Sequence, residues 1–135
     1  MQQLLKLLDD NIYVSRYRIW GDEVTVRDIL WTHPDSIKLL NAFPIMLIID
    51  STYKTNMYKL PLLDMVGVTS TEKTYSVMFA FLETVKEENV TRALEVSQSM
   101  LKDQEEMPKV IVTDHDTALM NSVAKVFHTS YALLY

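Results

Sequence analysis

Two short segments with an apolar centre, each followed at once by an aspartate, constrain the fold of this chain more than any other feature. The apolar run of residues 45–49 precedes Asp50, and residues 109–113, which read Lys-Val-Ile-Val-Thr, precede Asp114. A short and continuous apolar run is typical of a strand buried on both faces of a sheet. If the two strands lie parallel and adjacent, their carboxyl ends meet at the edge where open α/β sheets bind ligands. The sequence therefore predicts two carboxylates at one edge of a sheet.

The patterns around these runs predict a mixed α/β chain. Strands are expected at residues 12–19, 24–31, 45–49, 60–68, 74–82, 109–113 and 131–135, and helices at residues 2–9, 34–43, 89–106 and 116–127. From residue 45 onward, a three-stranded antiparallel meander is followed by parallel strands with crossover helices. This is the ribonuclease H-like order, although other α+β folds share it.

The composition removes most familiar chemistries. The 135 residues include no cysteine, which excludes disulfides, thiol nucleophiles and zinc sites with cysteine ligands. Gly21 and Gly67 are too far apart to form a phosphate-binding loop or a dinucleotide fingerprint. The net charge of −5 is not that of a chain that holds nucleic acid by itself. What remains is chemistry carried by carboxylates, or no chemistry at all.

The apolar runs also bear on membranes and secretion. None is long enough to cross a bilayer, and residues 1–10 lack the apolar core of a signal peptide. We therefore expect an intracellular protein with no membrane partner.

The candidate functional residues are the two strand-terminal aspartates. Converging carboxylates repel each other, and a hard divalent cation such as Mg²⁺ relieves that repulsion. Two such cations activate the attacking oxygen and stabilise the leaving oxygen in phosphodiester chemistry. In the structural alternative, Asp50 and Asp114 only end their strands. Asn89 and Asp116 are expected to cap the last two helices, and Asp64, inside an apolar run, is expected to lie on an exposed edge.

Four side chains beside these aspartates are candidates for contact with nucleic acid. Lys54 and Lys59 suit phosphate oxygens, Tyr53 suits a base or a sugar, and His115 suits a bound phosphate. Ordinary turn composition explains Tyr53 and the two lysines equally well, and His115 also fits an exposed loop.

Several segments stand together in an order and spacing that are specific. They are Asp50-Ser51-Thr52-Tyr53-Lys54-Thr55-Asn56, Pro61-Leu62-Leu63, Val66-Gly67-Val68-Thr69, Val110-Ile111-Val112-Thr113-Asp114 and Ala118-Leu119-Met120. This series resembles the transposase domain of Mutator-like elements (MULE), in the branch that includes the far-red-impaired-response-related proteins. The resemblance covers residues 10–135.

The resemblance implies a DDE transposase with a ribonuclease H-like fold. Residues 44–135 would be part of that domain, and residues 1–43 a β-hairpin and helix that lead into it. Asp50 and Asp114 would be the first and second catalytic acids and would bind Mg²⁺ or Mn²⁺. The family's third acid, a glutamate, and its Cys-x-x-His element come later than Tyr135. We therefore expect this fragment to be inactive alone.

The resemblance leaves the functional class open. In the first class, the chain belongs to a nuclear catalytic core whose full-length parent binds, cuts and joins DNA. In the alternative, it is a domesticated, non-catalytic module in transcriptional regulation or protein interaction, and a third possibility is an inert product. The acidic balance predicts little DNA affinity for the fragment and favours contact with protein.

Overall fold

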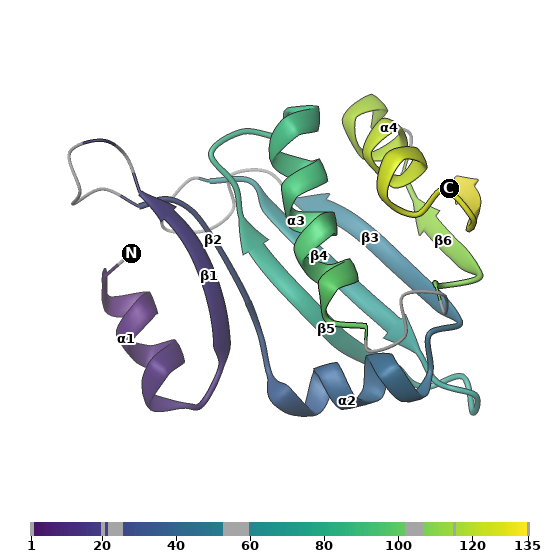
Figure 1. Cartoon of the computed structure of the whole chain (residues 1–135), viewed down its shortest axis with the longest axis horizontal. Coiled ribbons are helices and arrows are strands. Elements are labelled where there is room, and N and C mark those ends of the chain that lie inside the picture. The colour runs from purple at the N-terminus through teal and green to yellow at the C-terminus, as the bar shows by residue number, and fades with distance from the viewer. Residues whose placement is uncertain are drawn as a thin grey trace.

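The computed structural model describes residues 2–19, 21, 26–52, 60–101, 107–114 and 116–134. The elements along the chain are α1 (Gln2–Asp10), β1 (Val14–Ile19), β2 (Val26–Thr32), α2 (Pro34–Ala42), β3 (Met46–Thr52), β4 (Leu62–Val68), β5 (Thr74–Phe81), α3 (Glu87–Ser99), β6 (Val110–Thr113), α4 (Thr117–Val126) and β7 (Tyr131–Leu134). Figure 1 shows a twisted sheet with α3 and α4 packed across one of its faces.

The described strands form one mixed sheet in the order β1-β2-β5-β4-β3-β6-β7. β3, β4 and β5 are an antiparallel meander, and the β1–β2 hairpin extends the sheet by pairing with β5. β6 is parallel to β3, and β7 is parallel to β6. Helix α3 connects β5 to β6, and α4 connects β6 to β7. The predicted meander and the parallel strands that follow it are confirmed, which places β3 and β6 side by side.

The main core lies between the sheet and the two helices α3 and α4. Alternate residues of β3 and β4 are almost completely buried there, namely Leu47 and Ile49 together with Leu63 and Met65. The helices contribute Val90, Ala93, Leu94, Leu119, Val123 and Val126. The intervening residues of β3, such as Ile48, are only half-buried on the opposite face. The expected burial of this strand on both faces therefore holds fully for one face only.

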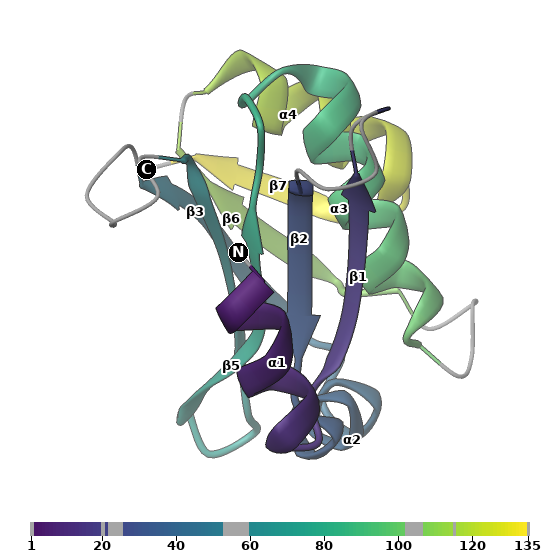
Figure 2. The ribbon, with the colours of Figure 1, turned by 90° about the vertical axis from the view of Figure 1, so that its left-hand side faces the viewer.

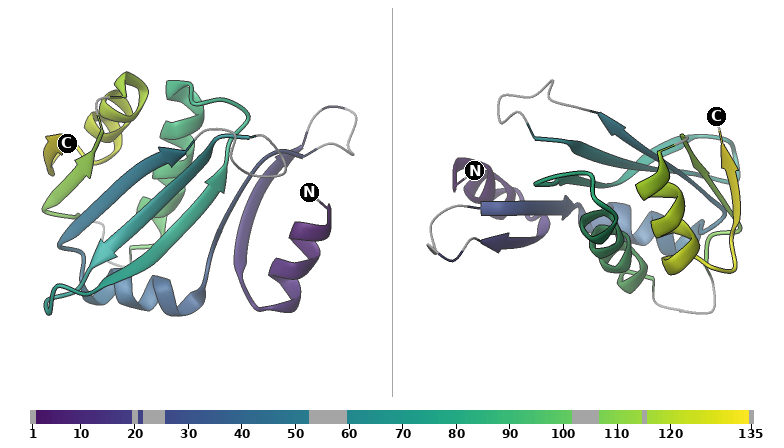
Figure 3. Two further views of the ribbon diagram at one scale, coloured as in Figure 1. Left: turned by 180° about the vertical axis from the view of Figure 1, so that it is seen from behind. Right: turned by 90° about the horizontal axis from the view of Figure 1, so that it is seen from above.

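Helix α1 covers part of the opposite face. Its Leu8 packs in a second apolar cluster with Ile29 of β2 and Phe81 of β5. Leu30, which follows Ile29, and Ala80, which precedes Phe81, belong to the main core. Successive side chains in a strand point to opposite faces, so the second cluster lies on the face opposite the main core. Figures 2 and 3 show α1 and α3 on opposite sides of the β1–β2 hairpin. Within the described part of the chain, no helix is long and apolar enough to span a membrane.

The two predicted helix caps have different outcomes. The carboxylate of Asp116 accepts a hydrogen bond from the N–H of Leu119 at 3.0 Å, so its predicted role at the start of α4 is confirmed. Helix α3 begins earlier than expected, with Lys86 as the N-cap residue, so the prediction for Asn89 is wrong. Asn89 is buried in the first turn, where its amide donates to the carbonyl and the hydroxyl oxygen of Thr84. A tertiary role has replaced the capping role that its residue type favours.

Candidate functional site

Asp50 lies in the second half of β3, on the face of the sheet opposite α3 and α4. The preceding residue, Ile49, is completely buried in the main core, so the alternation of the strand carries Asp50 to the other face. The Asp50 side chain is exposed, and its Oδ1 accepts a hydrogen bond from the N–H of Ser51 at 2.9 Å. This local contact orients the carboxylate. The prediction that the strand ends at Asp50 is wrong, because β3 stays paired with β4 as far as Thr52.

Asp114 directly follows β6 and stands before the start of α4. Its Oδ1 accepts a hydrogen bond from the N–H of Asp116 at 3.0 Å, which makes a tight side-chain turn between strand and helix. The Asp114 side chain is half-buried. Since Asp116 caps α4 at the same time, the short connection fixes the carboxylate of Asp114 between two regular elements.

The strand register brings these two aspartates to one edge of the sheet. β3 and β6 are parallel neighbours, and the last pair in their ladder is Ile49 with Thr113. Asp50 and Asp114 are the residues that come next along the chain after this pair. In Figure 1 both arrows run toward the same edge, where α4 begins. The sequence predicted that the two carboxylates meet if their strands are parallel and adjacent. The structure meets that condition.

A further acid, Asp64, lies directly opposite Asp50 in the antiparallel β3–β4 ladder. The expectation that Asp64 lies on an exposed edge is wrong, because β4 is an inner strand between β3 and β5 and the side chain is half-buried. Its Oδ1 is buried and has no hydrogen-bond partner among the described residues. Burial, and secondly the negative charge of Asp50, raise the pKa of the Asp64 carboxyl. The signal for this residue was visible in the sequence as a lone acid in an apolar strand.

The described residues around the three aspartates offer little positive charge. No lysine or arginine in the described ranges forms an ion pair with Asp50, Asp64 or Asp114. Within the same ranges, no group of three acidic or histidine side chains lies close enough to hold a metal ion as the structure stands. The arrangement therefore offers hard oxygen ligands in pairs, and Mg²⁺ is commonly held by one or two carboxylates and water.

The four predicted nucleic-acid contacts lie outside the residues that the structure describes. Tyr53, Lys54 and Lys59 belong to the connection between β3 and β4, and His115 lies between β6 and α4. Their role stays a prediction from the sequence.

A second polar cluster joins three elements on the helix side of the sheet. Asp28 of β2 is 2% exposed and accepts hydrogen bonds from Arg18 of β1 and Arg92 of α3. Arg18 also donates to the side-chain oxygen of Asn89 at 2.9 Å. Sequence reasoning missed this cluster, although opposite charges on the two strands of a hairpin are a recognisable signal for its Arg18–Asp28 half. Both arginines of the cluster are paired with Asp28, so we interpret the cluster as one that stabilises the fold.

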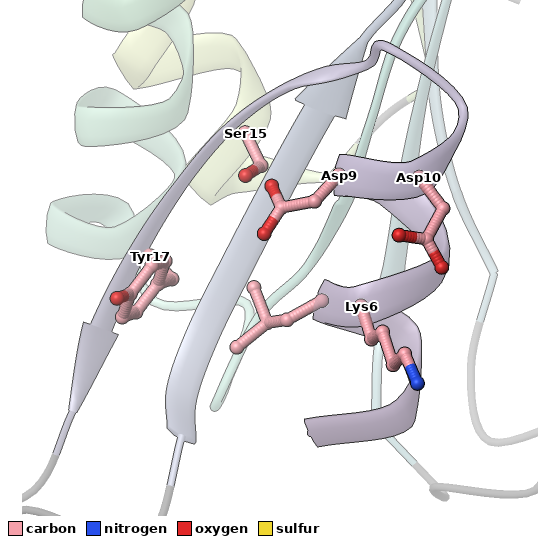
Figure 4. Close-up of a pocket in the computed structure, with 6 residues that line it drawn as sticks. Lys6, Asp9, Asp10, Ser15 and Tyr17 are labelled. Carbon is pink, nitrogen blue, oxygen red and sulfur yellow. The ribbon is translucent and has the colours of Figure 1, made fainter.

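A cavity of about 360 Å³ lies away from the carboxylates, between α1 and the edge strand β1. Figure 4 shows the side chains that line it, and Asp9, Ser15 and Tyr17 are among them. The cavity is open to solvent and none of the predicted site residues contributes to it. Its position does not alter the assignment of the candidate site to the carboxyl ends of β3 and β6.

Comparison with known proteins gives a family and two curated relatives. The family model of the MULE transposase domain matches residues 46–134. One relative, the PKS-NRPS hybrid synthetase cheA of Chaetomium globosum, is 30% identical over 134 residues, which are 94% of this chain and 3% of that protein. Another, Protein FAR1-RELATED SEQUENCE 6 of Arabidopsis thaliana, is 29% identical over 111 residues, which are 82% of this chain and 15% of that protein.

The chain thus spans a small part of each curated relative, and the whole proteins' activities do not transfer with these matches. The family match is different, since it covers β3 to β7 and includes both Asp50 and Asp114. The second relative agrees with the far-red-impaired-response-related branch of the resemblance. The chain belongs to the MULE transposase domain family.

Proposed function

We propose that Asp50 and Asp114 are two of the carboxylates that hold divalent cations in a DDE-type transposase core with a ribonuclease H-like sheet. The observation that carries this proposal is the parallel register of β3 and β6, in which Asp50 and Asp114 directly follow the last paired residues, Ile49 and Thr113. The family match supports the class of reaction, cleavage and joining of DNA by phosphoryl transfer.

The donor chemistry of the site fits Mg²⁺ or Mn²⁺. Both candidates are carboxylates, which are hard oxygen ligands, and each already has one oxygen oriented by a backbone N–H. The buried, unpartnered oxygen of Asp64 nearby is a further acceptor without a donor among the described residues. When bound, the cations would neutralise negative charge on a phosphodiester and lower the pKa of an attacking water. The chain's own part is to place and orient the carboxylates.

The proposed DNA partner would meet the same edge. Lys54, Lys59, Tyr53 and His115 are the side chains that the sequence offers for phosphate, sugar or base contact. Because its proposed substrate is DNA, we place the full-length protein in the nucleus as part of this proposal.

Metal binding tests the proposal more directly than turnover, because two carboxylates hold two cations poorly. We expect the chain to bind Mn²⁺, measured by electron paramagnetic resonance of the free ion. Asp50→Asn and Asp114→Asn should each weaken the affinity tenfold or more. Glu95→Gln is the matched control, since Glu95 is an exposed carboxylate on α3. Unchanged Mn²⁺ affinity in both aspartate variants would overturn the proposal.

The net charge favours a second candidate, a non-catalytic module that contacts protein. At −5, the chain is repelled by the phosphate backbone unless local lysines or cations offset its charge. An electrophoretic mobility shift at physiological salt distinguishes the two candidates. Tight binding of DNA by this chain counts against the second candidate, and Mn²⁺ binding that depends on Asp50 counts for the first.

A further inference from the structure

The unusual residue of this sheet is Asp64. It lies in β4, an inner strand, with Asp50 directly opposite on β3 and Phe79 directly opposite on β5. Paired residues in adjacent strands point to the same face, so Asp64 shares the face of Asp50. One neighbour is therefore a carboxylate and the other an aromatic ring, and neither supplies a positive charge or a hydrogen-bond donor from its side chain.

This placement is costly for a side chain with no role. Like charges that lie directly opposite in a sheet destabilise it, and a buried acceptor without a donor costs further stability. Asp64 carries both costs, since it faces Asp50 and its Oδ1 is buried and unpartnered among the described residues. A hydrophobic residue at this position would fit the apolar strand without either penalty.

Asp28 shows how the same sheet treats a structural acid. Asp28 is buried almost completely, and two arginines from two other elements bind its two carboxylate oxygens. Asp64 has no arginine or lysine partner within the described ranges. Among the described residues, the backbone of Met65 forms a hydrogen bond with the Asp64 carboxylate, and no side chain balances its charge.

We propose that Asp64 is a second carboxylate ligand, beside Asp50, for the divalent cation at the carboxyl end of β3. The inference rests on the proposed function, because it assigns one more ligand to the cation that Asp50 would hold. A cation shared by Asp50 and Asp64 would relieve their repulsion and give the unpartnered oxygen a ligand. Two carboxylates with water completing the shell is a common way to hold Mg²⁺.

Mn²⁺ titration of the 135-residue chain tests the inference. Asp64→Asn should weaken Mn²⁺ binding tenfold or more, as Asp50→Asn does, while Glu95→Gln leaves it unchanged. Thermal melting without metal checks that each variant is folded. The rise in melting temperature on adding Mn²⁺ should be smaller for Asp64→Asn than for the unaltered chain, since a ligand stabilises the fold that binds it.

A measurement on the unaltered chain makes the result independent of any folding defect. Substoichiometric Mn²⁺ should broaden the side-chain carboxyl ¹³C signals of Asp50 and Asp64 and spare that of Asp28. If Asp50→Asn abolishes binding but Asp64→Asn does not, and the Asp64 signal stays sharp, the inference is overturned while the proposed function stands. If the unaltered chain binds no Mn²⁺, the inference and the metal site of the proposed function both fail.

Discussion

Asp28 on β2 and Arg92 on α3 connect the amino-terminal hairpin to the helix layer, with 3.1 Å between Arg92 Nη1 and Asp28 Oδ1. Arg18 on β1 binds the other carboxylate oxygen of Asp28 through its Nε at 2.8 Å. Burial lowers the pKa of Arg92, and the charge of Asp28 opposes that shift. One buried carboxylate thus holds two strands and a helix together.

Replacing that carboxylate should be among the more damaging single changes. Asp28→Asn keeps the shape of the side chain but leaves two part-buried guanidinium groups without their counter-charge. We expect the free energy of unfolding to fall by about 2–3 kcal/mol, below the range for a fully buried pair because both arginines are partly solvated. Urea denaturation measures the loss. The exposed Glu95→Gln should stay within about 0.5 kcal/mol, and an equally small effect of Asp28→Asn would contradict the structural role.

The pH dependence of stability should single out Asp64. Its pKa is raised in the folded chain, chiefly by burial, so the folded state binds this proton more tightly than the unfolded state. The free energy of unfolding therefore falls as the pH rises from the ordinary value of 3.8 through the raised pKa. Asp64→Asn removes that loss, so the variant should have a higher free energy of unfolding than the unaltered chain at pH 7. The gain is limited to about 1 kcal/mol because the side chain is partly solvated.

The measurement is thermal denaturation in buffer with a chelator, repeated from pH 7 down toward pH 4. The stabilising effect of Asp64→Asn should shrink as the pH falls, since the carboxyl of the unaltered chain becomes protonated. A destabilised Asp64→Asn variant at pH 7 without metal would show that the ionised carboxylate has a partner that offsets its cost.

The elements of this fold were largely predictable because their signals are local. The apolar residues before Asp50 and Asp114 indicate buried strands, and the alternating pattern of the meander strands indicates that one face of each packs against the core. The cap at Asp116 depends only on residues within one turn, and it was predicted correctly.

The misplaced residues depend on contacts that the local sequence does not encode. Whether Asp64 lies at an edge or inside the sheet is decided by the pairing of β4 with both β3 and β5. Asn89 has the side chain of a good cap, but that side chain forms hydrogen bonds with Thr84 and Arg18 instead. Asp28 and Arg92 are 64 positions apart, so no short-range pattern connects them.

A close cross-strand contact makes Gly67 a sensitive position in β4. Gly67 pairs with Tyr75 of β5, and a Cβ on Gly67 would lie only 2.8 Å from Cε1 of the Tyr75 ring. The ring is held by a hydrogen bond from its hydroxyl to the carbonyl oxygen of Phe43 at 3.3 Å. We expect Gly67→Ala to cost about 1–3 kcal/mol, because the ring must move and lose that contact.

A double-mutant cycle checks this explanation. In a Tyr75→Ala background, Gly67→Ala should cost much less, since the obstructing ring is gone. Gly21→Ala is the matched control, because nothing lies within 4 Å of a Cβ at that position. Equal costs in both backgrounds would show that the penalty of Gly67→Ala does not come from the Tyr75 ring.

The adjacent acids Asp114 and Asp116 allow stability and metal binding to be separated. Asp116→Ala removes the cap of α4 and should lower the free energy of unfolding by about 1 kcal/mol, while Asp116→Ser should restore most of it. The hydrogen bond to Asp114 comes from the backbone N–H of residue 116, so it survives both changes. Mn²⁺ affinity should therefore be nearly unchanged in Asp116→Ala and reduced in Asp114→Asn. The reverse pattern, with Mn²⁺ binding lost in Asp116→Ala and kept in Asp114→Asn, would move the cation from Asp114 to Asp116.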